Sequence, residues 1–237
     1  MIRQKYRLKC KISSTLYGAV CACEDTHNSN ELVAIKQVSL NLAASILKAH
    51  PNVDNPWHEK RAINKLLELP PHPNLVHFYE EFLHNESWFV VMEFCPEGDL
   101  WDRMQCSPNG QVPEKEALRL FREVTRGLHY LHTNGVAHRD VSLENVLLRN
   151  GVCKIADLGL ATDAERTCKN EMVGKAYYMA PVGCKCFLQL GIRRVVCAWQ
   201  ISSFISNEAC DLMSALLQRN PIDRLTTSDV LAHPLLQ

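Results

Sequence analysis

The stretch that decides the fold is His138-Arg139-Asp140-Val141-Ser142-Leu143-Glu144-Asn145, and Asp157-Leu158-Gly159 follows it. Between them, the apolar runs Val146–Leu148 and Val152–Ile155 flank a turn at Asn150-Gly151, which predicts two short strands. This order puts two carboxylates and one amide on adjacent loops. Such oxygen donors suit a hard cation, and phosphoryl transfer requires them because the negative charge at the reacting phosphate has to be neutralised.

Helical patterns surround this stretch in the second part of the chain. From Pro113 to Asn134 apolar residues recur on one face, with Pro113 as the predicted first helical residue and Asn134-Gly135 as the stop. Helical spacing returns at Asn207–Gln218 and Thr227–Ala232. The second part is therefore expected to be mainly helical.

The first third of the chain is strand-like and contains one helical pattern. The helix is predicted at Pro56–Leu69, and Pro70 ends it. Four β-prone runs are separated by polar segments: Leu16–Cys23, Leu32–Val38, Leu75–Phe82 and Trp88–Phe94. These patterns predict an α+β protein of two lobes, a β-rich lobe at residues 1–94 and a mainly helical lobe at residues 95–237.

Composition restricts the classes of partner. Lys plus Arg and Asp plus Glu each total 26 in 237 residues, so the charge balance points to neither nucleic acid nor an anionic membrane. No apolar run approaches the ~18 residues of a membrane span, and the first residues lack the apolar stretch of a signal peptide. We therefore expect a cytoplasmic protein, with the nucleus as the alternative, whose cysteines are reduced thiols.

In chain order, the motifs resemble those of the serine/threonine protein kinases. The matching segments are Val33-Ala34-Ile35-Lys36, Met92-Glu93-Phe94, residues 138–145, Asp157-Leu158-Gly159 and Met179-Ala180-Pro181. The resemblance extends over Leu8–Pro181 and again over Ser203–Leu236. It implies a two-lobed kinase fold, ATP as the phosphate donor, Mg2+ as the metal, and a protein substrate with a serine or threonine hydroxyl.

The resemblance also implies a role for each polar group. Asp140 would orient the substrate hydroxyl and accept its proton, while Asn145 and Asp157 would hold Mg2+. Lys36 would hold the α- and β-phosphates of ATP. Glu144 precedes Asn145 where tyrosine kinases have Arg, which favours a serine/threonine acceptor.

The implied nucleotide site combines side chains and backbone groups. Glu93 and Cys95 would present backbone groups to adenine, and Asp99 would meet the ribose. The other implied nucleotide contacts are Gly18, Val20 and Ala34.

The loop expected to cover the phosphates departs from the family pattern. Where the family has three glycines, this chain has Ser13, Thr15 and Gly18. Serine and threonine restrict the backbone more than glycine and crowd its approach to phosphate. We therefore expect nucleotide binding that is weakened but retained.

Lys36 needs an anionic partner, for which the sequence offers two candidates. Glu59 is the first, on the assumption of a short insertion at Leu69-Pro70-Pro71, because family spacing counted back from His72-Pro73-Asn74 would otherwise miss it. Glu68 is the alternative.

A second departure is an exchange of residue types. Where the family has Lys shortly after the catalytic Asp, the chain has Ser142, and where the family has Thr after the residue matched by Gly174, it has Lys175. In the family these two side chains meet at the catalytic Asp. Two interpretations stay open: Lys175 supplies the positive charge near the γ-phosphate that Ser142 cannot, or Lys175 is a solvated loop residue.

Arg139 suggests control by phosphorylation of the loop that follows Gly159. The candidate acceptors are Thr162 and Thr167, whose added negative charge Arg139 would pair.

The resemblance breaks after Pro181. Val182 stands in place of the family's Glu, and residues 182–198 contain no counterpart of the central helix of the second lobe. In the family that Glu pairs with a buried Arg, here Arg224, so Arg224 is expected to move out to solvent, because a buried, unpaired charge would cost about 3–5 kcal/mol. The alternatives to an active kinase are a nucleotide-binding pseudokinase or scaffold inactivated by an internal deletion, and a fragment without function.

Overall fold

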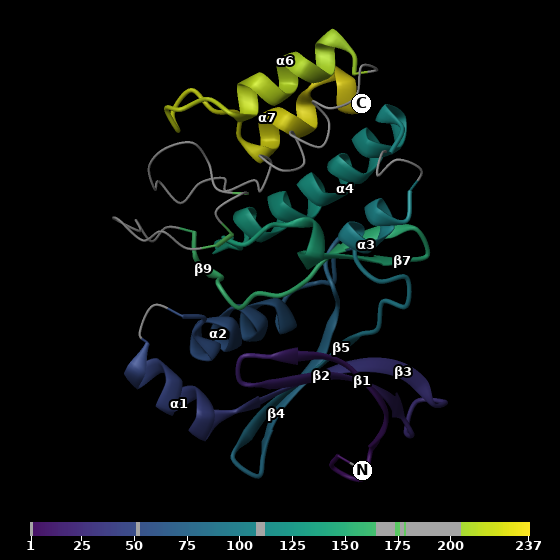
Figure 1. Ribbon diagram of the computed structural model, residues 1–237, viewed down its shortest axis with the longest axis vertical. Coiled ribbons are helices and arrows are strands. Elements are labelled where there is room, and N and C mark those ends of the chain that lie inside the picture. Colours follow the sequence, from purple (N-terminus) through teal and green to yellow (C-terminus); the bar gives the residue numbers. More distant parts are fainter. Residues whose placement is uncertain (1, 51–52, 108–111, 165–173, 176–177, 179–204) are drawn as a thin grey trace. The chain divides into compact units, whose positions relative to one another are not determined.

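The computed structural model describes residues 2–50, 53–107, 112–164, 174–175, 178 and 205–237 (Figure 1). The chain divides into two compact units. The first consists of Met1–Pro71 and Val76–Pro96, and the second of His72–Leu75 and Glu97–Gln237. The later boundary lies close to the predicted division after residue 94, whereas no pattern in the sequence predicts that residues 72–75 pack with the second unit.

The first unit is an antiparallel sheet with two helices. Across the sheet the strands follow the order β1-β2-β3-β5-β4. The elements are β1 Tyr6–Thr15, β2 Gly18–Asp25, β3 Glu31–Ser39, α1 Leu40–Ala49, α2 Pro56–Leu67, β4 Phe78–His84 and β5 Ser87–Glu93. Seven buried side chains form a core cluster on this sheet, namely Tyr6, Cys23, Val33, Ile35, Phe82, Phe89 and Val91.

Two elements of the first unit were not predicted. β1 is an edge strand whose residues from Arg7 to Ser14 are exposed, so it lacks the alternation that identifies a half-buried strand. α1 follows β3 directly, and Ser39 caps it by accepting a hydrogen bond from the N–H of Leu42. Ala43 is the buried residue of α1, and its other apolar side chains are exposed or half-buried, so this helix contributes little to the core.

The second unit is mainly helical, as predicted, and its short strands form pairs. Its elements are α3 Leu100–Gln105, α4 Glu114–Thr133, β6 Val136–Ala137, the 3-10 helix η2 Leu143–Asn145, β7 Val146–Arg149, β8 Val152–Ile155, β9 Thr162–Asp163, α6 Asn207–Leu216, α7 Thr227–Ala232 and the 3-10 helix η4 Pro234–Leu236. β6 pairs with β9, and β7 with β8. α4 packs against α7 and β8 (Figure 1). Pro113 is the N-cap of α4, not its first helical residue. Within the described ranges, every helix is too short or too polar to cross a membrane.

The expectation that Arg224 moves out to solvent is wrong. Arg224 is 7% exposed, and its Nε and Nη2 donate to the backbone carbonyl of Gln218 at 3.2 and 2.8 Å. Burial lowers the pKa of the guanidinium. A backbone carbonyl therefore takes the place of a carboxylate as its acceptor among the described residues. The predicted loss of the central helix concerns residues 182–198, which lie outside the described part of the chain.

Gly127 lets α4 approach Asn74 closely. A Cβ atom at Gly127 would lie 2.6 Å from Asn74 O and 2.8 Å from Ile155 Cδ1, which is closer than non-bonded atoms lie. The backbone N–H of Ile155 donates to Asn74 O at 3.0 Å, and Asn74 Nδ2 donates to Cys153 O at 3.2 Å. Asn74 thus holds β8 against α4, and only a glycine in α4 leaves it room.

Gly127→Ala should destabilise the second unit. Alanine favours a helix over glycine by about 1 kcal/mol, but overpacking costs about 1–3 kcal/mol, so we expect a lower midpoint in thermal unfolding. Arg126→Ala, at the neighbouring exposed position of α4, is the control and should leave the midpoint unchanged. A Gly127→Ala protein that melts with the wild type would contradict this packing argument.

Candidate active site

Hydrogen bonds from two segments hold both carboxylate oxygens of Asp140. Asn145 Nδ2 donates to Asp140 Oδ2 at 2.9 Å and to the backbone carbonyl of Asp140 at 2.8 Å. The backbone N–H of Lys175 donates to Asp140 Oδ1 at 3.2 Å. The carboxylate is thereby fixed in one orientation, and it can still accept another donor because an ionised carboxylate offers about four lone-pair sites.

His138 connects the loop of Asp140 to the segment before Asp157. Its Nδ1 accepts the backbone N–H of Asp140 at 3.2 Å, so Nε2 carries the proton and donates to Ala156 O at 2.9 Å. The imidazole is 1% exposed, and burial lowers its pKa. His138 is thus a neutral connector. No role for His138 was predicted from the sequence, although a histidine beside a candidate catalytic Asp is a visible signal.

Asn145 and Asp157 lie at the open end of the β7–β8 hairpin. Val146 pairs with Ile155 at this end, and the backbone N–H of Ala156 donates to Asn145 O at 2.9 Å. Because Asn145 Nδ2 is bound to Asp140, the amide oxygen faces away from Asp140. An amide oxygen and a carboxylate are hard donors of the kind that Mg2+ prefers, so the residues present fit this metal.

The backbone at Asp157 has an unusual conformation. Its φ is +57°, in the left-handed region that non-glycine residues adopt rarely. The backbone N–H of Gly159 donates to Asp157 Oδ1 at 3.3 Å. Positive φ at a carboxylate residue points to a functional constraint on where that side chain lies.

Gly174 brings Lys175 to the catalytic loop. Its φ of +94° favours glycine, and a Cβ there would lie 2.6 Å from Arg139 O. Lys175 Nζ donates to Ser142 Oγ at 2.7 Å and lies 3.4 Å from Glu144 Oε2. The ammonium group therefore contacts the catalytic loop, while 38% of the Lys175 side chain is exposed, so both interpretations of Lys175 stay open.

Glu144 lies between Lys175 and Tyr178. The hydroxyl of the buried Tyr178 donates to Glu144 Oε2 at 3.3 Å. Burial acts to raise the pKa of Glu144, but hydrogen bonds to its own backbone and from Ser142, with the charge of Lys175, outweigh burial and lower the pKa. Glu144 is therefore ionised and balances the charge of Lys175.

The structure describes two of the three candidate regulatory residues, Arg139 and Thr162. Arg139 has a positive φ of +66°, and its Nε donates to Leu160 O at 2.7 Å. Thr162 is half-buried in β9, where it pairs with Ala137. Thr167 lies outside the described residues, as does the Met179-Ala180-Pro181 motif.

In the first unit, Lys36 is paired with Glu59. Lys36 Nζ donates to Glu59 Oε1 at 2.5 Å, and the two side chains are 14% and 6% exposed. Asn55 caps α2, and this start of the helix puts Glu59 among its buried residues. Glu68 is the exposed C-cap of α2, so the structure selects Glu59 from the two candidates.

The turn between β1 and β2 is tightly packed. A Cβ at Gly18 would lie 2.2 Å from Gln37 O, so β3 itself requires this glycine. Tyr17 is buried, and its hydroxyl donates to Asp54 O. Thr15 Oγ1 is buried and has no hydrogen-bond partner within the described ranges.

Small side chains lie on the same sheet face as Lys36. Val20 pairs with Lys36 and Ala22 with Ala34 across β2 and β3. Because residues two apart in a strand share a face, these four side chains lie on one face of the sheet. Val20 and Ala34 thus form an apolar surface beside the ammonium group, as an adenine ring requires.

The three residues predicted near adenine and ribose also have structural partners. Glu93 Oε2 accepts the backbone N–H of His77 at 3.1 Å, and Cys95 is half-buried. Asp99 Oδ1 accepts the N–H of Asp102 at 2.8 Å and caps α3. The capping role was not predicted, although an Asp before a helical pattern is a recognised signal.

The predicted site residues therefore gather within each unit. The first unit holds Gly18, Val20, Ala34, Lys36, Glu59, Glu93 and Cys95, and the second holds Asp99, Asp140, Asn145, Asp157 and Lys175. In the second unit, hydrogen bonds join Asp140, Asn145 and Lys175 directly.

Glu59→Gln tests the ion pair of Lys36. Neutralising a little-exposed carboxylate leaves Lys36 less firmly oriented, and a displacement of about 1 Å can cost about 100-fold in rate. We expect a large loss of phosphate transfer and weaker nucleotide binding. Glu68→Gln is the matched control and should behave as the wild type; equal behaviour of the two variants would remove Glu59 from the site.

Comparison with known families gives a match along most of the chain. The family model described as "Protein kinase domain" matches residues 6–185. The match ends close to Pro181, after which the sequence analysis places the break in the resemblance.

Individual relatives are similar at about the same level. The chain is 32% identical over 198 residues to serine/threonine-protein kinase PLK4 of Nematostella vectensis, covering 70% of this chain and 20% of the relative. It is 28% identical over 276 residues to calcium-dependent protein kinase 24 of Arabidopsis thaliana, covering 100% and 45%. It is 29% identical over 264 residues to NUAK family SNF1-like kinase 2 of Rattus norvegicus, covering 98% and 40%.

Two facts about length follow from these alignments. The chain spans less than half of the length of these curated relatives. The alignment with the Arabidopsis thaliana relative runs over 276 positions, whereas the chain has 237 residues, so that relative contains residues that this chain lacks.

Proposed function

The chain belongs to the protein kinase family, and we propose that it transfers the γ-phosphate of MgATP to a serine or threonine hydroxyl of a protein substrate. The observation that carries this proposal is the Asp140 carboxylate, which Asn145 and Lys175 hold from either side. This arrangement leaves a fixed acceptor beside a candidate metal ligand. An in-line phosphoryl transfer needs these two groups together.

Asp140 serves as the proton acceptor in the proposed reaction. The substrate hydroxyl donates to the carboxylate, its oxygen forms a bond to the γ-phosphorus, and the bond from that phosphorus to the bridging oxygen of ADP breaks. The hydroxyl proton ends on Asp140. Since both carboxylate oxygens are already oriented by N–H groups, no reorganisation of the side chain is required.

Asn145, Asp157 and Lys36 supply the remaining groups of the proposal. Mg2+, when bound, neutralises phosphate oxygens, and Asn145 and Asp157 would hold it. Lys36 would bind the α- and β-phosphates, with Glu59 fixing its direction. Gly18, Val20 and Ala34, the backbone at Glu93 and Cys95, and Asp99 would bind the rest of ATP.

The partner and the location extend the same proposal. The relatives that are named serine/threonine-protein kinases support a serine or threonine acceptor, and the balanced charge supports a partner other than nucleic acid. A cytoplasmic location, with the nucleus as the alternative, stays a prediction from the sequence.

Transfer of labelled γ-phosphate from MgATP to a generic serine/threonine substrate tests the proposal. The wild-type chain should transfer phosphate, and Asp140→Asn and Lys36→Met should each lower the rate by about 100-fold or more, because each removes a group that acts in the transition state. Unfolding curves of all three proteins show whether a loss of rate is a loss of fold.

The alternative function predicts a different result in the same assay. A pseudokinase would bind nucleotide, detectable as a nucleotide-dependent rise in the unfolding midpoint, without any transfer. Such a result from a folded wild-type chain would overturn the proposal in favour of a nucleotide-binding scaffold.

We further propose that Lys175 provides a positive charge next to Asp140. Its Nζ donates a hydrogen bond to Ser142 Oγ, and its backbone N–H donates one to Asp140 Oδ1. A cation fixed at this place stabilises the negative charge that develops on the γ-phosphate in the transition state. Removal of such a group lowers the rate by about 100-fold to 1,000-fold. The resemblance gives the reason for its position, because the family's Lys is replaced here by Ser142.

An exchange experiment tests Lys175. Lys175→Ala should lower the turnover rate severely with little change in nucleotide affinity. A Ser142→Lys/Lys175→Ala double variant moves the positive charge from position 175 to position 142. This variant should restore much of the rate. Ser142→Ala serves as the control that keeps the charge of Lys175. A normal rate for Lys175→Ala would show that Lys175 has no catalytic role.

A further inference from the structure

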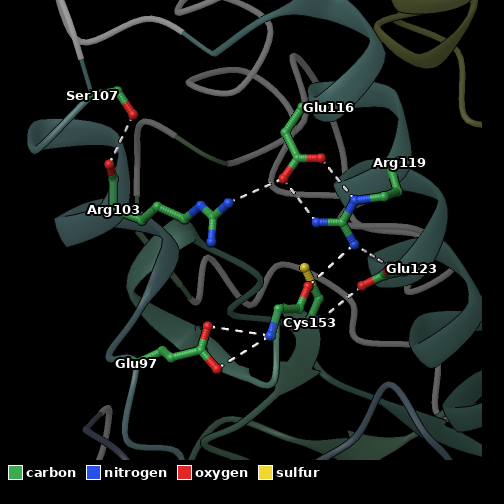
Figure 2. Close-up of polar contacts among 8 residues, drawn as sticks. Glu97, Arg103, Ser107, Glu116, Arg119, Glu123 and Cys153 are labelled. Carbon is green, nitrogen blue, oxygen red and sulfur yellow. Dashed lines mark hydrogen bonds and ion pairs between the residues drawn. The ribbon is translucent and has the colours of Figure 1, made fainter.

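A charged cluster holds the turn of the β7–β8 hairpin, at the end opposite to Asn145 and Asp157. Figure 2 shows this turn clamp, which consists of Glu97, Arg103, Glu116, Arg119 and Glu123. Neither the sequence motifs nor the proposed catalytic steps give these residues a role. Their contacts converge on the backbone at Gly151 and Cys153.

Arg119 is the centre of the turn clamp. Its Nε and Nη2 donate to the two carboxylate oxygens of Glu116, each at 2.8 Å, and its Nη1 donates to Glu123 Oε1 (Figure 2). Nη1 also donates to the backbone carbonyl of Gly151 at 3.2 Å. Arg103 adds a bond to Glu116 at 3.2 Å. A planar guanidinium offers five N–H donors in a fixed fork, whereas a lysine ammonium offers three donors on a flexible stem.

Two carboxylates bind the N–H groups of the hairpin. Both oxygens of Glu97 accept the N–H of Gly151 at 3.2 Å, and Glu123 Oε2 accepts the N–H of Cys153 at 2.8 Å. The side chain of Glu123 is 16% exposed, so its charge needs a partner, and Arg119 supplies it. Arg119 thus holds the hairpin both directly and through Glu123.

The hairpin connects the turn clamp to the site. β7 and β8 are short, and an isolated two-stranded hairpin is marginally stable. Leu148 and Cys153 are buried in a core cluster, which fixes the middle of the hairpin. Its open end carries Asn145 directly before β7 and Asp157 shortly after β8, joined by the bond from Ala156 N–H to Asn145 O.

We propose that Arg119 is a positioning residue for the two candidate metal ligands, Asn145 and Asp157. The inference rests on the proposed function for the metal, but the restraint on the hairpin stands on the contacts of the turn clamp alone. Mg2+ requires near-octahedral geometry and tolerates small displacements of its ligands poorly. Residues that orient metal ligands from outside the ligand set typically change metal affinity about 10-fold to 100-fold when they are replaced.

Arg119→Met tests the restraint in the absence of any ligand. Methionine keeps the length and apolar stem but removes every donor. Hydrogen–deuterium exchange should become faster in the peptides that cover residues 143–158, including their end near Asn145 and Asp157. Arg126→Met removes an exposed arginine from the same helix and should leave exchange in these peptides unchanged. Unchanged exchange at residues 143–158 in Arg119→Met would overturn the proposal.

A second measurement tests the effect on the metal. Binding of a fluorescent ATP analogue is titrated with Mg2+, and Arg119→Met should need about tenfold more Mg2+ for half-maximal binding, while binding in EDTA stays the same. Glu97→Gln, which leaves Arg119 in place, should give a smaller shift in the same direction.

The outcomes separate the two proposals. A wild-type chain that shows no Mg2+-dependent nucleotide binding contradicts the proposed function. In that case, hydrogen–deuterium exchange at residues 143–158 still tests whether Arg119 restrains the hairpin, because this measurement needs no ligand. A variant with a lower unfolding midpoint but an unchanged Mg2+ requirement would assign Arg119 to stability alone and overturn the positioning role.

Discussion

The carboxylate of Asp140 is held by N–H groups from two distant segments, and the candidate active site depends on that restraint. Asn145 binds one oxygen and the backbone of Lys175 binds the other. An ionised carboxylate away from bulk water needs donors of this kind, and charge-assisted hydrogen bonds are the strong ones. The direction of the Asn145 amide and the arrival of Lys175 at the loop both follow from satisfying this one group.

Several of the charged side chains named above form local ion pairs, and the balanced totals of acidic and basic residues do not indicate a large surface of one sign. Lys36 with Glu59, Lys175 with Glu144, and Arg119 with Glu116 and Glu123 each bring opposite charges together. The equal totals of acidic and basic residues agree with this arrangement. Orientation of individual groups, and not attraction over long distance, is what these pairs supply to a bound phosphate.

Elements with a clear period of burial were predicted from the sequence, and those without one were missed. α4 and α7 bury one face, and β7 and β8 flank an Asn-Gly turn, so their positions could be recognised. β1 buries almost nothing and left no such pattern, while α1 buries only Ala43 and its apolar residues were not recognised as a helix. Family spacing predicted Asp140, Asn145 and Asp157 as site residues, because the chemistry of the family requires them at defined places along the chain.

The sequence failed where an alternative partner decides the outcome. Arg224 remains buried because a backbone carbonyl accepts its hydrogen bonds, and backbone acceptors leave no trace in a motif. Gly18 was predicted only as a nucleotide contact, and the closeness of Gln37 O is a packing constraint that the motif did not reveal. Arg119 went unnoticed because one of its partners, the backbone carbonyl of Gly151, lies far along the chain.

The contact between Lys175 Nζ and Ser142 Oγ also changes how substitutions at these positions should be understood. A lysine lost from one loop and gained in another would count as two unrelated changes in a comparison of sequences. Here the two side chains touch, and the glycine before Lys175 leaves the room that the chain needs to reach the loop. Positions 142 and 175 are therefore in direct contact, so the effects of substitutions at them should not simply add.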